Sequence, residues 1–125
     1  MKITICGSMA FLEKYEKTKK HLELKGHEII IPEKDPMPEP VPKERKLKTM
    51  IDFNENLFKS DGILVMNYTK KDKENHIGVN TLMEIGMAFN RKKQIFILNP
   101  IPEQYKHELE AINCIVINKD LEKIQ

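Results

Sequence analysis

Three features of this sequence predict an α/β fold: a flavodoxin-like (Rossmann-like), doubly wound five-stranded parallel sheet with helices on both faces. Short apolar runs rich in isoleucine alternate with longer charged amphipathic stretches, as expected of repeated βαβ units. The runs are continuously apolar rather than alternating, so both faces of each strand should be buried, which is typical of a parallel sheet. The length of 125 residues fits one domain, residues 1–125.

The first βα unit is bounded by glycines. Residues 2–6 (KITIC) form the first predicted strand, which ends at Gly7. Residues 11–25 carry apolar side chains at helical spacing among lysines and glutamates, and Gly26 follows as a helix stop. Residues 28–31 then form the second predicted strand.

A proline-rich segment separates this strand from the next helix. Residues 32–42 (PEKDPMPEPVP) hold five of the seven prolines, and no helix or central strand tolerates that spacing. We expect an extended loop, which is either a stiff surface connection or a flap over a ligand site. The amphipathic stretch 43–59 follows as the second predicted helix.

The rest of the chain repeats the same alternation. Strands are predicted over residues 62–66, 94–98 and 114–117, and helices over residues 81–90 and 102–111. Right-handed crossovers between parallel strands leave few topologies, of which we predict the strand order 2-1-3-4-5.

Charge and composition exclude several classes of protein. Lys and Arg number 21 and Asp and Glu 19, so the net charge is only +2. This is not the strong, clustered positive charge expected of a nucleic-acid-binding protein. No apolar run approaches the length of a membrane span, and the N-terminus does not have the pattern of a signal peptide, so a cytoplasmic location is expected. Cys6 and Cys114 are far apart in apolar segments and are expected to be free thiols. The four histidines lack the spacing of metal ligands, and we expect neither a metal nor a cofactor.

In a doubly wound sheet, ligands bind outside the carboxyl ends of the strands, next to the point where the strand order reverses. This rule selects residues 7–10, 67–69 and 76–81 as candidate binding segments. The first segment offers backbone N–H groups and a hydroxyl for an anion, although Gly7 could simply make a turn and Ser8 cap a helix. It contains neither GxGxxG nor the P-loop pattern, which disfavours dinucleotide and P-loop chemistry.

Glu84 has two interpretations. Thr81-x-x-Glu84 matches a capping box, which would be a purely structural role. Alternatively, Glu84 lies in the first turn of the helix after the third strand, where the helix dipole would keep its carboxylate ionised and suited to act as a nucleophile. Gly86 costs about 1 kcal/mol relative to Ala within a helix, so it suggests that a backbone or a ligand approaches closely.

Four segments in order resemble the nucleoside 2-deoxyribosyltransferase superfamily, which includes nucleoside 5′-monophosphate N-glycosidases: ICGSM, SDGILVMNYT, GVNTLMEIGMAF and KKQIFILNP. The resemblance implies one nucleoside 2-deoxyribosyltransferase-like domain. By match, Glu84 attacks C1′ of the sugar and carries a covalent glycosyl ester after the base leaves. Asp61 matches an aspartate that orients the sugar or protonates the base; because it opens the third predicted strand, the alternative is a plain helix-terminal aspartate. Gly7, Ser8 and Met9 match the loop that contacts the nucleotide.

Further candidates for substrate binding follow the third and fourth strands. Tyr68 could stack on a base or form a wall of the core, and Asn99 lies in a region that approaches the neighbouring subunit's site in the family. Gly78, Asn80 and Thr81 lead into the helix that carries Glu84. Gly78 stands where transferases commonly have a second acidic residue, and Asn80 where the motif usually has glycine. The lysines of residues 70–75 are read as a solvated surface.

The absence of that acidic residue favours hydrolysis, or a monophosphate substrate, over base transfer. The leading hypothesis is therefore an enzyme that cleaves or transfers at the N-glycosidic bond of a small nucleoside or nucleotide. The alternative is a non-catalytic nucleotide-binding module of the same fold. Cytokinin-type phosphoribohydrolases are disfavoured because their glycine run is absent. A homodimer or higher homo-oligomer is expected, since family members complete their sites with a partner subunit.

Overall fold

The computed structural model describes residues 1–33 and 39–125. Its single sheet is parallel throughout, and the strand order β2-β1-β3-β4-β5 confirms the predicted topology. The strands are β1 (Lys2–Cys6), β2 (Glu28–Ile30), β3 (Gly62–Val65), β4 (Gln94–Ile97) and β5 (Ile115–Val116). The helices are α1 (Leu12–Leu24), α2 (Lys43–Lys59), α3 (Val79–Asn90) and α4 (Lys106–Ala111), with 3₁₀ turns η1 (Met9–Phe11), η2 (Glu103–Tyr105) and η3 (Leu121–Lys123).

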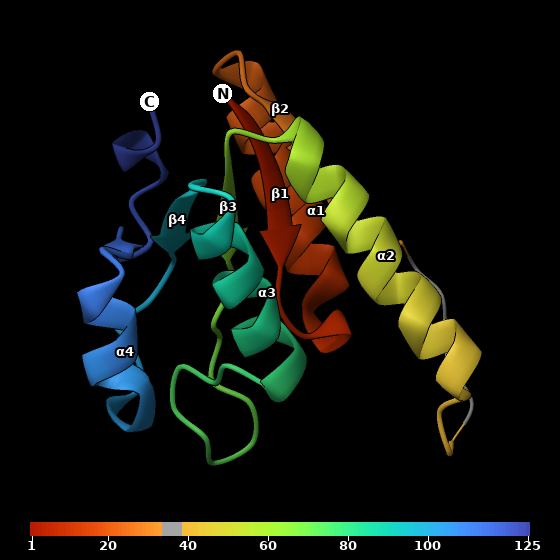
Figure 1. Cartoon of the computed structure of the whole chain (residues 1–125). Helices are drawn as coiled ribbons and strands as arrows, with labels where there is room; N and C mark the ends of the chain where they lie inside the picture. Colours follow the sequence, from red (N-terminus) through yellow and green to blue (C-terminus); the bar gives the residue numbers. More distant parts are fainter. Residues whose placement is uncertain (34–38) are drawn as a thin grey trace.

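Helices cover both faces of the sheet. Figure 1 shows α2 and α3 side by side in front of the strands and α1 behind them. The core is accordingly divided into two clusters of buried side chains. Ile3, Ile5 and Leu64 pack with α1, whereas Ile63 and Val65 pack with α2, α3 and α4. Burial on both faces explains why the strands read as continuous apolar runs.

Two helices differ from the prediction by more than one residue at an end, whereas the other predicted elements agree to within one residue. Helix α3 begins at Val79, two residues before the predicted start, because Gly78 rather than Thr81 is its N-cap. The last predicted helix is divided into η2 and the six-residue α4, with Pro102 as the residue that precedes η2.

The predicted proline loop over residues 32–42 lies partly outside the described residues. Helix α2, which follows it, buries only Phe53 and Leu57, so the N-terminal half of this helix has no fully buried side chain. Within residues 1–33 and 39–125, no helix combines the length and apolar character that crossing a membrane requires.

Candidate active site

The loops after β1 and β3 meet at the carboxyl edge of the sheet. Gly7, the first residue after β1, has φ +150°. A Cβ atom at this position would lie 2.5 Å from the Tyr15 hydroxyl and 3.1 Å from the Met66 carbonyl oxygen. No side chain fits there without displacing a buried tyrosine or the backbone after β3. Gly7 therefore brings the two loops together, and the loop after β1 lies directly beside the chain that leads to α3.

Ser8 connects these loops with a hydrogen bond. Its hydroxyl oxygen accepts from the Ala10 N–H (3.3 Å), which confirms that Ser8 acts as an N-cap, here of η1. The ammonium group of Lys70 donates to the same oxygen at 3.2 Å, and the Tyr15 hydroxyl donates to the Ser8 carbonyl. Lys70 is half-buried, so this lysine belongs to the site rather than to the solvated surface predicted for residues 70–75. A cation and a hydroxyl side by side form a suitable site for an anionic group.

Glu84 is half-buried on α3 and makes no hydrogen bond or ion pair with any other residue that the structure describes. Burial raises its pKa to about 7, although the positive charge of Lys46 on α2 acts in the opposite direction. This corrects the expectation that the helix dipole keeps the carboxylate ionised. With α3 starting at Val79, Glu84 lies in the second turn, where the dipole is weaker than in the first and loss of water dominates.

The capping-box interpretation of Glu84 is also wrong. Gly78 is the N-cap of α3, and no side chain caps this helix end among the described residues. Thr81 is the third residue of the helix and is buried. The Glu84 carboxyl group therefore does not take part in capping the N-terminus of α3.

The Glu84 carboxyl group is coupled electrostatically to groups on neighbouring elements. Burial, followed by the charge of Glu84, raises the pKa of the Cys6 thiol at the end of β1. Burial chiefly raises the pKa of Tyr15 as well, and Glu84 adds to this effect with Cys6 and Tyr68. Together with the influence of Lys46, these couplings show that the Glu84 carboxyl group is within electrostatic reach of the end of β1 and of Lys46 on α2.

Asp61 lies at the opposite edge of the sheet from Glu84, as expected of a residue that precedes β3. Its carboxylate accepts from the Lys2 N–H at 2.8 Å, and its own N–H donates to the Lys2 carbonyl at 2.7 Å. Residues that precede a strand of a parallel sheet lie at the amino edge, whereas Glu84 and Gly7 lie toward the carboxyl edge. Asp61 joins the starts of β1 and β3.

Asn99 is used to hold two strand ends together. Its backbone N–H donates to the Asn67 side-chain oxygen at 2.9 Å, and its side-chain amide donates to the Asn67 carbonyl at 3.1 Å. The Asn67 side chain in turn donates to the Asn99 carbonyl at 3.0 Å. Both residues are buried. The predicted binding candidate Asn99 thus has a structural role, and Asn67 shares it.

Tyr68 lies on the α1 side of the carboxyl edge. Its ring is 5.2 Å from the Phe11 ring between centroids, and the Lys14 ammonium lies 4.1 Å from its centre. Burial raises the pKa of its hydroxyl. Because the ring is only half-buried, it forms a wall of the core and also remains accessible at the loop surface. Met9 and Asn80 are exposed at the same edge.

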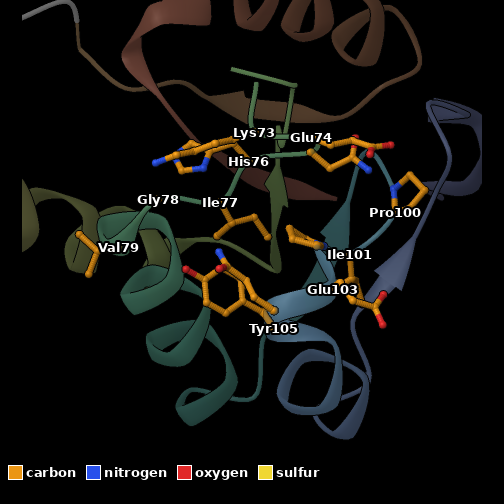
Figure 2. Close-up of a pocket in the computed structure, with 13 residues that line it drawn as sticks. Lys73, Glu74, His76, Ile77, Gly78, Val79, Pro100, Ile101, Glu103 and Tyr105 are labelled. Carbon is orange, nitrogen blue, oxygen red and sulfur yellow. The ribbon is translucent and has the colours of Figure 1, made fainter. Parts of the chain in front are cut away.

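A cleft of about 770 Å³ borders the candidate site. It lies between the segment that leads into α3 and the segment from Pro100 to Tyr105. Figure 2 shows the His76 and Tyr105 side chains on two sides of this cleft, with Ile77 between them. Burial, together with Lys73 and Lys70, lowers the pKa of His76. The cleft shares Gly78 with the candidate site, but neither Glu84 nor Ser8 lines it.

Two site residues were missed in the sequence. Lys70 follows the candidate segment 67–69 directly, and this position is the one signal that could have identified it. Lys46 is one of several basic residues at the start of α2, and nothing in the local sequence distinguishes it.

No family model and no curated protein matches the sequence. Solved structures share its fold. A 2-deoxyribosyltransferase from Bacillus psychrosaccharolyticus has a TM-score of 0.60 and 18% identity over 82% of this chain and 75% of that one. The CMP N-glycosidase BcmB from Clostridium botulinum has a TM-score of 0.60 and 19% identity, covering 95% of this chain and 91% of that one. A 2-deoxyribosyltransferase from Leishmania mexicana has a TM-score of 0.60 and 17% identity over 84% and 71% of the two chains. The chain therefore has the fold of the nucleoside 2-deoxyribosyltransferase superfamily.

Proposed function

We propose that this protein cleaves the N-glycosidic bond of a (deoxy)nucleoside or nucleoside 5′-monophosphate, with Glu84 as the nucleophile. The observation that carries the proposal is the half-buried Glu84 carboxyl group, which is electrostatically coupled to Cys6 at the end of β1 and has no hydrogen-bond partner among the described residues. An unpaired carboxyl group in such surroundings is characteristic of a functional site. The fold shared with a deoxyribosyltransferase and a CMP N-glycosidase adds support.

The reaction we propose is a double displacement. The ionised Glu84 carboxylate attacks C1′, the bond from C1′ to the base nitrogen breaks, and the base leaves with the bonding electron pair. Water then attacks C1′ of the glycosyl ester: its oxygen forms the new bond to C1′, the ester C–O bond breaks to restore the carboxylate, and the proton that the water loses balances, through solvent, the proton that the departed base takes up. With a pKa of about 7, roughly half of the Glu84 carboxyl groups are ionised at neutral pH, and Lys46 favours the ionised form.

We prefer hydrolysis of a 5′-monophosphate to base transfer. Ser8 and Lys70 supply a hydroxyl and an ammonium group, 3.2 Å apart, where a phosphate could be held. Gly78 gives no acidic side chain at the position where transferases commonly have one. The remaining substrate contacts are assigned to residues at the carboxyl edge: Gly7, Met9, Tyr68, Gly78, Asn80 and Thr81.

A non-catalytic nucleotide-binding module remains the alternative. The observation that favours it is the distance of Asp61 from the site, because the predicted second carboxylate is then unavailable to protonate a leaving base. In that case Glu84 would be a binding residue, and nucleotides would associate without losing their base.

The test is base release from a panel of ribo- and deoxyribonucleosides and their 5′-monophosphates, with and without a free acceptor base. The variants are Glu84→Gln and, as a matched control, Glu55→Gln on the exposed surface of α2. We expect release by the wild type and the control, and a loss of about a thousandfold or more in Glu84→Gln. Mass spectrometry of denatured protein should detect a glycosyl adduct on the peptide that contains Glu84. Saturable binding without base release would instead establish the non-catalytic module.

A further inference from the structure

His76 is a half-buried residue on the segment that leads from β3 to α3. Its backbone N–H donates to the Tyr68 carbonyl at 3.1 Å, and the Asn75 N–H donates to the Thr69 hydroxyl at 3.2 Å. These two bonds close the loop that follows β3, so His76 is held at the carboxyl edge of the sheet. Within residues 1–33 and 39–125, neither nitrogen of its ring makes a hydrogen bond or an ion pair.

The His76 ring lies beside Gly78, the N-cap of α3. A Cβ atom built on Gly78 would be 3.6 Å from the His76 Nε2 atom, and no other described atom outside the adjoining chain lies within 4 Å of it. Figure 2 shows the two residues on the same side of the cleft. Gly78 is the position at which transferases of the superfamily commonly have an acidic residue. The imidazole therefore stands beside the space into which that acidic side chain would extend.

Three other titratable groups at this edge of the sheet hold their protons. Burial raises the pKa of Tyr68, and burial is also the main cause of the raised pKa values of Tyr15 and Cys6. A histidine, in contrast, changes its charge between about pH 5 and pH 8. His76 is therefore better suited than these three residues to exchange a proton with a substrate or with water near neutral pH.

The surroundings of His76 favour its neutral form. Burial, followed by the charges of Lys73 and Lys70, lowers its pKa. Two acidic residues, Glu74 and Glu103, also line the cleft, but both are exposed to solvent, which screens their charges. The ring is therefore mainly neutral at pH 7, and its unprotonated nitrogen can accept a proton.

We propose that His76 is the general base in the second half of the reaction, in which water hydrolyses the glycosyl ester on Glu84. The inference rests on the proposed function. The unprotonated nitrogen of the ring accepts a proton from the water molecule while the water oxygen bonds to C1′. The ester C–O bond breaks and restores the Glu84 carboxylate. The imidazolium then gives its proton to solvent, which balances the proton that the departed base takes up.

The two groups are separated by a span that suits this step. Gly78 and Glu84 are six positions apart, which corresponds to a rise of about 9 Å along a helix. The Cα–Cβ bond of a helical residue tilts toward the N-terminus, which is the end of α3 where the His76 ring lies. Glycosidases that hold a water molecule between two catalytic groups separate these groups by roughly 6.5–9.5 Å. Space for a sugar carbon and a water molecule is therefore expected between His76 and Glu84.

The cleft of about 770 Å³ provides a route for this water. His76 and Gly78 line it together with Tyr105, and Ile77 lies between the two rings (Figure 2). Because Gly78 has no side chain, nothing at this position separates the cleft from the first turn of α3. Water that moves from the cleft toward Glu84 therefore passes the His76 ring.

The test compares wild type, His76→Gln and the matched control His107→Gln, since His107 is exposed on α4. A general base contributes about 10²–10⁴-fold, so kcat of His76→Gln should fall about a hundredfold or more. Base release is the first irreversible step, so kcat/KM should stay within about threefold of wild type. A burst of base equal to the amount of enzyme should precede slow turnover, and mass spectrometry should show the glycosyl ester on Glu84 accumulating. The control should behave as wild type.

Sodium azide provides a second measurement on the same variant. The azide ion has no proton to lose, so it can attack C1′ of the ester without a general base and form a glycosyl azide. It should restore the turnover of His76→Gln and change that of wild type little. A loss of folding or of substrate binding would not be repaired in this way.

Three results would overturn the inference and leave the proposed function intact. The first is an unchanged kcat in His76→Gln. The second is an equal loss of kcat and kcat/KM without a burst, which would assign His76 to the first half of the reaction. The third is a burst variant whose turnover azide does not increase. Absence of base release by wild type would instead refute the proposed function, and the inference with it.

Discussion

The Lys70 ammonium group donates a hydrogen bond to the Ser8 hydroxyl at 3.2 Å, which joins the loop after β3 to the loop after β1. These residues are 62 positions apart in the chain, and the contact exists because parallel strands bring their carboxyl ends to one edge of the sheet. The pair puts one positive charge and one hydroxyl beside the backbone turn at Gly7. We therefore expect the charge and the length of the Lys70 side chain to affect how tightly a phosphate group on the substrate is bound.

Removing the Lys70 ammonium group should selectively weaken the binding of phosphorylated substrates. In Lys70→Met we expect KM for a nucleoside 5′-monophosphate to rise about tenfold or more, since a charge-assisted hydrogen bond to phosphate is worth roughly 1.5–3 kcal/mol. KM for the corresponding nucleoside should stay within about twofold. Lys71→Met, at the adjacent exposed lysine, is the control. Equal effects on both substrates would show that Lys70 does not bind the phosphate.

The pH dependence of base release should follow the ionisation of Glu84. If the carboxylate is the nucleophile, kcat/KM should increase about tenfold per pH unit below the pKa of about 7 and level off above it. Lys46→Met removes the positive charge that lowers this pKa, so the inflection should move to higher pH. The measurement is kcat/KM from about pH 5 to pH 9 for both proteins. An inflection that does not move in Lys46→Met would contradict the coupling between these residues.

The same raised pKa should reduce stability at neutral pH. Folded protein holds the Glu84 proton up to about pH 7, whereas the unfolded chain releases it near 4.5. Stability from this group is therefore fully present below about pH 4.5 and is lost as the pH rises through 7. Glu84→Gln should increase the free energy of unfolding at pH 8 by about 1–3 kcal/mol and change it little at pH 4. Urea unfolding at the two pH values measures the difference, and an equal change at both would refute the linkage.

The strand order could be predicted because continuous apolar runs, charged helices and crossover handedness all restrict the same topology. The location of Asp61 could be predicted as well, since a residue that opens β3 must lie at the amino edge. The start of α3 was mispredicted because Gly78 and Thr81 are both acceptable N-caps, and the tertiary structure selects between them. The direction of the long Lys46 and Lys70 side chains depends on packing between distant segments, which no local pattern records.

Asp61 should contribute to the stability of the folded protein and not to the rate of base release. Asp61→Ala removes the acceptor of the Lys2 N–H at the exposed start of β1, which should cost about 0.5–1.5 kcal/mol of unfolding free energy. Base release by the folded variant should stay within about twofold of wild type, because the carboxylate lies at the opposite edge from Glu84. The two measurements are denaturant unfolding and steady-state kinetics at a temperature where the variant is fully folded. A large loss of activity in the folded variant would restore Asp61 to the catalytic machinery.

Gly7 and Gly26 provide a matched pair for measuring how tightly the loop after β1 is packed. Both have positive φ, +150° and +94°, but a Cβ on Gly26 meets no atom within 4 Å among the described residues, whereas one on Gly7 lies 2.5 Å from the Tyr15 hydroxyl. Gly26→Ala should therefore cost only the backbone strain, about 1 kcal/mol, and Gly7→Ala should cost about 1–3 kcal/mol more because of overpacking. Tyr15→Phe removes the clashing oxygen, so it should recover part of the loss in Gly7→Ala. If Gly7→Ala and Gly26→Ala cost the same in urea unfolding, the turn at Gly7 is not packed tightly against Tyr15.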